Sequence, residues 1–146
     1  MSEANDERVA AVRVLARLYR LIERVESGLT LPQYRVLSAL DQGGLRSANL
    51  AARLAVRGPT LTAIADGLVA AGYATRESEP GDRRVVRLHA TEAGRAALAR
   101  ADEQYLAAIG PILDAAGGGV TTELIAVGAA LDERLKAKLT TKESKA

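Results

Sequence analysis

Arginine is the side chain with the most evident potential for binding chemistry, and it is concentrated in the middle of the chain. Residues 46–90 contain seven arginines and four acidic residues, whereas all four lysines follow Arg134. A guanidinium group is permanently charged and matches phosphates and guanine edges with paired donors. High-GC coding would also enrich arginine, but it does not explain an excess confined to the middle third. The distribution therefore points to a central segment suited to a polyanion.

Composition excludes most catalytic and metal-site chemistry. The chain has no cysteine and one histidine, His89. Disulfides, thiolate metal ligands, cysteine nucleophiles and a Cys/His zinc site are therefore excluded. A Ser-His-Asp triad would depend on that one histidine, which we interpret as an ordinary strand residue. Because no nucleophile or acid–base pair is evident, we expect no enzyme, no cofactor and no metal site.

The apolar residues limit the class of protein further. No apolar run approaches the roughly 20 residues that span a bilayer, and the acidic start Met1–Glu7 lacks the apolar centre of a signal peptide. We therefore expect a soluble, cytoplasmic protein with no membrane contact. The chain has four tyrosines and no phenylalanine or tryptophan. A core built mainly from alanine and leucine is thin for a monomer, so we expect an oligomer to share it.

Helices are expected along most of the chain, because apolar residues recur at steps of three and four. In the first half they are expected at residues 4–26, 31–42, 47–54 and about 59–71, the second being capped by Thr30. A long helix should follow the cap Thr91, with a kink or restart at Gly110–Pro111. After the break at Gly117–Gly119, Thr121 or Thr122 should cap a last helix.

Between these helices the pattern changes to a hairpin. Residues 73–78 and 84–89 read as two short strands, and residues 79–82 have the composition of a turn. The fold class is therefore mainly α with a small β-hairpin wing. A short helix, a tight turn, a second helix and then a basic hairpin form a winged helix-turn-helix.

This arrangement suits the grooves of DNA. The outer side of the helix at about 59–71 has small side chains and can enter a major groove, while its N-terminal amides favour phosphate. The residues expected to contact DNA are Ser47, Arg57, Pro59, Thr60, Thr62, Ala63, Arg83 and Arg84. Arg83 and Arg84 would reach a minor groove, and Asp82 would pair with one of them and stabilise the wing. The alternative for these arginines is a solvated hairpin tip.

Four ordered stretches resemble the MarR family of transcriptional regulators. They are Leu31–Leu37, Ser47–Ala51, Leu61–Arg76 and Asp82–Gly94. The resemblance implies one MarR-like domain over 1–146. Within it the resemblance implies a winged lobe at 30–95, a helical dimerisation region at 1–29 and 96–139, and a frayed tail at 140–146. Ala63 departs from the polar or basic residue that is frequent in the family at this position.

The resemblance also implies partners. A homodimer would bind a pseudo-palindromic site in double-stranded DNA and repress its own or an adjacent operon. A small anionic or phenolic effector would release it. Tyr19, Tyr34 and Tyr105 are the candidate residues for its pocket, and core packing is the alternative role for these tyrosines, because they lie on apolar helical faces. Two alternatives stay open: a DNA-binding regulator that responds to no ligand, and a helical dimeric interaction module that does not bind DNA.

Overall fold

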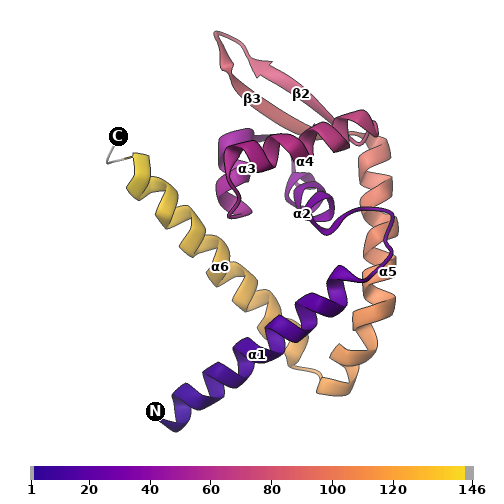
Figure 1. Cartoon of the computed structure of the whole chain (residues 1–146), viewed down its shortest axis with the longest axis vertical. Coiled ribbons are helices and arrows are strands. Elements are labelled where there is room, and N and C mark those ends of the chain that lie inside the picture. The colour runs from indigo at the N-terminus through magenta and orange to yellow at the C-terminus, as the bar shows by residue number, and fades with distance from the viewer. Residues whose placement is uncertain (1, 144–146) are drawn as a thin grey trace.

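The computed structural model describes residues 2–143 and is mainly helical, with one small sheet (Figure 1). In chain order the elements are α1 (Glu3–Glu23), α2 (Leu31–Leu40), β1 (Leu45–Arg46), α3 (Ser47–Arg53), α4 (Gly58–Ala70), β2 (Ala74–Glu79), β3 (Asp82–Ala90), α5 (Glu92–Ala116) and α6 (Val120–Glu143). The predicted fold class is confirmed. Within the predicted lobe of 30–95, we use the name winged lobe from here on for residues 31–90, which contain α2 to β3, and we call α1, α5 and α6 the terminal helices.

Two threonine caps mark the start and the end of the winged lobe. Thr30 Oγ1 accepts a hydrogen bond from the amide of Gln33 at 3.2 Å, and the Gln33 side chain accepts one from the Thr30 amide at 3.0 Å. This reciprocal pair is a capping box. Thr91 Oγ1 accepts from the amide of Gly94 at 3.0 Å and donates to the carbonyl of Gly72 at 2.6 Å. Both threonines are the caps that the sequence predicts.

The sheet is antiparallel, with β3 between β1 and β2. Arg46 of β1 and Glu77 of β2 both lie directly opposite Arg87 of β3. The register of the hairpin shifts between Ser78 and Glu79, so that Glu79 pairs with Asp82. β3 runs further at both ends than the sequence predicts, whereas β2 has the predicted length and begins one residue later. β1 is not predicted at all, because two residues are too few to show an alternating pattern.

The hydrophobic core lies mainly in the winged lobe. Its largest fully buried side chains are Val36, Leu37, Leu40, Leu50, Leu68 and Leu88. No residue of α1 is buried, and no described side chain of α6 is buried either. Each of these two helices exposes a row of apolar side chains at helical spacing: Val12, Leu15 and Tyr19 on α1, and Leu124, Val127 and Leu131 on α6. Such rows on two long helices leave apolar surface uncovered in the single chain.

The terminal helices differ from the prediction at three points. α5 continues through Pro111 as one helix, so there is no restart at Gly110–Pro111. The predicted cap at Thr121 or Thr122 is wrong, because α6 begins at Val120 and the Glu123 amide donates to the Gly119 carbonyl at 3.0 Å. The helix then runs to Glu143, beyond the predicted start of the tail at 140, and residues 144–146 lie outside the described part.

α5 leads away from the winged lobe and α6 returns toward it (Figure 1). The two helices are bent by 112° at the break of Gly117–Gly119. On its return α6 approaches α3, where Arg53 Nη2 lies 3.7 Å from Asp132 Oδ2. Within residues 2–143 no helix taken singly is long and apolar enough to cross a membrane, and α5 with α6 reaches those criteria only as a bent pair.

Candidate nucleic-acid interface

A tight turn joins α3 to α4 and fixes their relative orientation. The amide of Val56 donates to the carbonyl of Ala51 at 2.9 Å, and Ala55 has φ 54°, a conformation that is uncommon outside glycine. Arg35 Nη2 donates to the carbonyl of Leu54 at 2.7 Å and so anchors the turn to α2. Arg57 follows in an extended conformation as the N-cap of α4. The turn therefore presents the start of α4 on the surface.

One side of α4 is buried and the other is open. Leu61, Ala65 and Leu68 pack into the core. The remaining surface of its first turns is formed by small, exposed residues that the sequence predicts as DNA contacts: Pro59, Thr60, Thr62 and Ala63. The Thr62 hydroxyl donates to the carbonyl of Gly58 at 3.1 Å. A helix with this outer side fits a groove closely, and its free N-terminal amides favour a phosphate.

The wing ends in a tight turn that projects two arginines. Asp82 Oδ1 accepts from the backbone amide of Arg84 at 3.0 Å and from its Nε at 3.3 Å. The Arg84 side chain is 92% exposed all the same. Arg83 is exposed as well. The structure thus brings Asp82 and Arg84 together as the sequence anticipates, while their role toward DNA stays a prediction.

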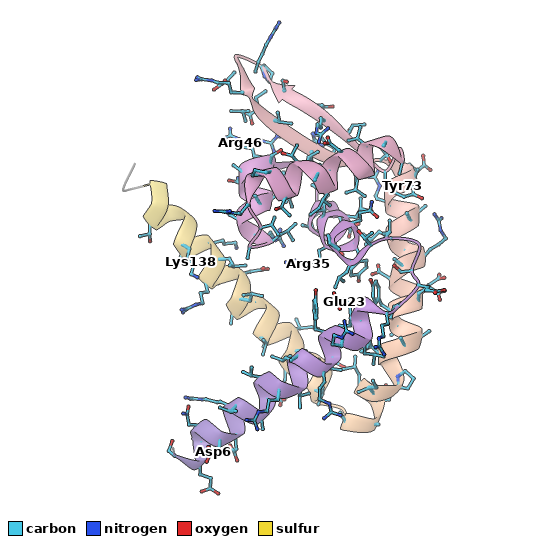
Figure 2. All side chains as sticks on the ribbon, viewed as in Figure 1. Asp6, Glu23, Arg35, Arg46, Tyr73 and Lys138 are labelled. Carbon is cyan, nitrogen blue, oxygen red and sulfur yellow. The ribbon has the colours of Figure 1, made fainter. Side chains whose placement is uncertain are left out.

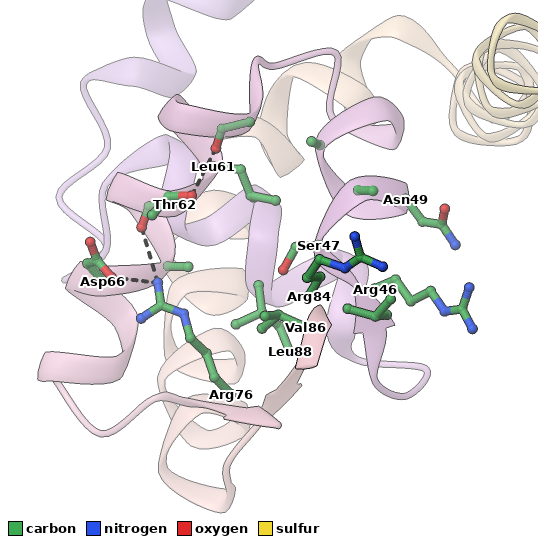
Figure 3. Close-up of a pocket in the computed structure, with 15 residues that line it drawn as sticks. Arg46, Ser47, Asn49, Leu61, Thr62, Asp66, Arg76, Arg84, Val86 and Leu88 are labelled. Carbon is green, nitrogen blue, oxygen red and sulfur yellow. Dashed lines mark hydrogen bonds and ion pairs between the residues drawn. The ribbon is translucent and has the colours of Figure 1, made fainter. Parts of the chain in front are cut away.

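A cleft of about 630 Å³ separates the wing from α3 and α4 (Figure 3). Its rim includes Ser47 at the half-buried start of α3, Thr62 of α4 and Arg84 of the wing. Leu61, Val86 and Leu88 contribute apolar side chains to its lining. Because one cleft is lined from all three elements, α3, α4 and the wing face the same side of the lobe.

Sequence reasoning missed an ion pair that joins α4 to the hairpin. Arg76 of β2 donates through Nη2 to the Asp66 carboxylate of α4, and the same nitrogen lies 3.3 Å from the carbonyl of Thr62 (Figure 3). The hairpin is therefore tied to the middle of α4. No sequence signal identifies this pair, because Asp66 lies on a helix and Arg76 on a strand, and no single residue spacing relates the two.

A second missed cluster lies at the base of the wing. Glu79 receives hydrogen bonds from Arg46 and from Arg87, and these bonds, that from Arg46 foremost, hold the pKa of the Glu79 carboxyl below its usual range. Finding this cluster from the sequence would have required knowledge of β1, which places Arg46 beside Arg87.

The three candidate tyrosines lie away from this face, and only two of them meet. The rings of Tyr34 on α2 and Tyr105 on α5 have centroids 4.4 Å apart. Tyr19 is 53% exposed on α1. None of the three lines the cleft beside the wing. In Figure 2, Arg46 marks the wing side of the molecule, whereas Asp6 marks the start of α1 at the opposite side.

Comparison with known proteins connects this geometry to a family. Residues 27–85 match the model of the MarR family. Over 83 residues the chain is 32% identical to the uncharacterized HTH-type transcriptional regulator YpoP of Bacillus subtilis (strain 168). That alignment includes 56% of this chain and 59% of YpoP, so it spans about three-fifths of the length of this curated relative.

Solved structures extend the likeness to the terminal helices. The transcriptional regulator BldR from Sulfolobus solfataricus has a TM-score of 0.75 at 24% identity, over 91% of this chain and 99% of BldR. CouR from Rhodococcus jostii RHA1, bound to p-coumaroyl-CoA, has a TM-score of 0.72 at 22% identity, over 90% of this chain and 95% of CouR. At these identities the likeness is one of fold. The family match covers the helix-turn-helix and part of the wing, and the fold agrees over nearly the whole described length, so the chain is similar to MarR-family regulators in both respects.

Proposed function

We propose that this protein is a transcriptional regulator that binds double-stranded DNA through the winged lobe. The observation that carries the proposal is the shared cleft, whose lining comes from α3, the start of α4 and the wing. With these elements on one side, α4 can enter a major groove while Arg83 and Arg84 reach an adjacent minor groove. Arg57, at the N-cap of α4, is placed for a guanine edge or a phosphate.

We also propose that the working form is a homodimer and a repressor. The support is the apolar surface that the single chain leaves open on α1 and α6. A second copy of the chain would cover it and complete the thin core. Two winged lobes related by two-fold symmetry would then require a pseudo-palindromic site, with half-sites about 34–36 Å apart. Bound there, the dimer would occlude a promoter of its own or an adjacent operon, acting in the cytoplasm.

Release by a small phenolic or anionic effector is the finer part of the proposal. Its support is the aromatic contact between Tyr34 and Tyr105, which lies where α2 of the winged lobe meets α5. CouR, a neighbour in fold, binds p-coumaroyl-CoA, a phenolic thioester. A ligand at this junction would favour one orientation of the lobe over another. A thermal-shift screen with phenolic acids separates this from a ligand-independent regulator, for which the melting temperature would not move.

The decisive experiment on DNA binding is an electrophoretic shift on the region upstream of the gene. The wild-type protein should bind it with a steep salt dependence, because arginine–phosphate contacts release counterions. Replacing both Arg83 and Arg84 by alanine should weaken binding at least tenfold while the dimer, measured by light scattering, stays intact. Binding unaffected by that double substitution would refute the role of the wing. A dimer that binds no duplex would support the alternative of an interaction module.

A further inference from the structure

The base of the wing contains two arginines that face each other. Arg46 of β1 and Arg87 of β3 are direct cross-strand partners. Like charges in this position destabilise a sheet unless something neutralises them. Here the Glu79 carboxylate lies between them. It accepts from Arg46 Nε and Nη2, each at 2.9 Å, and from Arg87 Nη2 at 3.0 Å. One carboxylate therefore makes an otherwise unfavourable pair favourable.

The cluster joins three parts of the winged lobe. Arg46 is the residue just before α3 and serves as its N-cap. Arg87 also donates through Nη1 to the carbonyl of Gly44 at 3.0 Å, in the segment that leads into β1. Glu79 stands at the register shift of the hairpin, opposite Asp82. A path of bonded groups thus runs from the start of α3, through Glu79, to the turn that projects Arg84.

We propose that Glu79 is a positioning residue for DNA recognition: by binding both Arg46 and Arg87, it sets the angle of the wing relative to α3 and α4. This inference rests on the proposed DNA binding. The bidentate bond from Arg46 gives the contact a defined direction as well as strength. With that angle fixed, the wing tip meets the minor groove at the same time as α4 enters the major groove. Without it, each contact can form but the two do not form together.

Electrostatics and positioning predict opposite changes in DNA affinity when Glu79 is neutralised, so the proposal can be tested. Glu79 is a negative charge on a face proposed to meet phosphates, and it occupies two arginines. If charge alone mattered, neutralising Glu79 would strengthen binding to any DNA. A positioning role requires the opposite for a specific site, because free arginines on a misaligned wing do not restore the geometry. For DNA of arbitrary sequence, where docking geometry matters less, binding should be unchanged or stronger.

The chain offers a matched control two residues away. Glu77 lies on the same strand with its side chain 69% exposed, and its nearest described partner is His89 Nε2 at 3.4 Å. It stands opposite Arg87 in the register, but no hydrogen bond between the two is described. Glu77→Gln and Glu79→Gln therefore remove the same charge from the same strand, and only the second releases Arg46 and Arg87. Glu79→Asp tests whether the carboxylate must reach both arginines, because it keeps the charge on a side chain one methylene shorter.

The experiment measures two affinities for each variant. One probe is a duplex selected from a random library by the wild-type protein, and the other is a scrambled duplex of the same length. We expect Glu79→Gln to weaken binding to the selected duplex at least tenfold, with the scrambled duplex bound as well as or better than by wild type. Glu79→Asp should fall in between, and Glu77→Gln should match wild type on the selected duplex.

Each other outcome is informative. If Glu79→Gln or Glu79→Asp binds the selected duplex like the wild type, Glu79 does not position the wing and the inference is overturned. An equal loss on both duplexes would show a structural role only, and would also overturn it. If the wild-type protein selects no duplex over scrambled DNA, the proposed function itself fails. Hydrogen exchange adds an independent readout, since Glu79→Gln should speed exchange in residues 79–87 but not in α2.

Discussion

The hydroxyl of Tyr34 lies 2.6 Å from Oδ1 of Asp102, and this bond joins α2 of the winged lobe to α5 across 68 residues of sequence. The Tyr34 ring also packs against Tyr105 of α5. Burial, together with the hydrogen bond to Asp102, raises the pKa of Tyr34 to about 12. The contact is therefore both a link between the lobe and a terminal helix and a group whose ionisation depends on the fold.

Alkaline pH should weaken this link. The folded protein holds the Tyr34 proton more tightly than the unfolded chain, where the tyrosine pKa is about 10. The stability that Tyr34 contributes is thus fully present below about pH 10 and is lost as the pH rises through about 12. The free energy of unfolding of the wild type should fall over that window, more steeply than that of Tyr34→Phe, which lacks the ionising group.

At neutral pH the same substitution removes one hydrogen bond to a charged acceptor near the surface. We expect Tyr34→Phe to cost roughly 1 kcal/mol in urea unfolding. Tyr73, a tyrosine for which no hydroxyl contact of this kind is described, gives the matched control Tyr73→Phe. Parallel alkaline profiles for wild type and Tyr34→Phe would show that the Asp102 bond does not couple to folding.

Gly94 should tolerate no side chain. A Cβ at this position would lie 2.0 Å from the carbonyl oxygen of Tyr73, which is backbone and cannot move aside freely. That carbonyl also accepts from the Thr91 amide at 3.0 Å. Gly94→Ala should therefore destabilise the protein by about 3 kcal/mol, in the upper range for overpacking.

Gly118 provides the comparison for Gly94. A Cβ there meets nothing within 4 Å, so Gly118→Ala should change stability by less than about 0.5 kcal/mol. Equal melting temperatures for the two variants would mean that the start of α5 can shift away from Tyr73 without loss. The expected ordering is wild type and Gly118→Ala together, well above Gly94→Ala.

Acid should loosen the base of the wing. Because Arg46 and Arg87 hold the pKa of Glu79 below its ordinary value of about 4.3, the folded state favours the charged carboxylate. The stability from this cluster is present above that value and is lost as the pH falls below it. The difference in melting temperature between wild type and Glu79→Gln should accordingly shrink toward pH 3. A difference independent of pH would show that the Glu79 charge is not what holds the two arginines.

The sequence predicts the parts of the fold that depend on residues close together in the chain better than the contacts between distant elements. Local chemistry was predicted well: Thr30 and Thr91 cap helices because their hydroxyls meet amides three residues on, and the hairpin follows from its turn residues. At Pro111 the expected restart is wrong, because α5 tolerates the missing amide and continues as one helix. Thr121 and Thr122 misled because the Gly119 carbonyl already starts α6.

The contacts between elements could not be predicted. Arg46 and Arg87 are 41 residues apart and meet only because the two-residue strand β1 pairs with β3. Asp66 and Arg76 each look like ordinary surface charges until α4 and β2 are placed side by side. Arginine-rich composition indicated that the middle of the chain binds an anion. It did not indicate which arginines are free to do so and which are held by Glu79.

The exposed apolar row on α6 should form the dimer. Val127 and Leu131 are 58% and 54% exposed and lie one helical turn apart. Burying two such side chains against a second copy stabilises association by about 1.5–3 kcal/mol each, and placing two carboxylates there would add a desolvation cost. The double substitution Val127→Glu and Leu131→Glu should therefore shift the protein from dimer to monomer at micromolar concentration, as measured by light scattering after gel filtration.

Val69→Glu is the control for that experiment, because Val69 is an exposed apolar residue of α4 in the winged lobe, at 37%. It should leave the dimer intact. The α6 double variant should retain a folded lobe, since the core residues lie elsewhere, yet bind a palindromic duplex no better than half of it. A wild-type protein that is monomeric at these concentrations would remove the dimer from the proposal, and the apolar rows on α1 and α6 would then need a different partner.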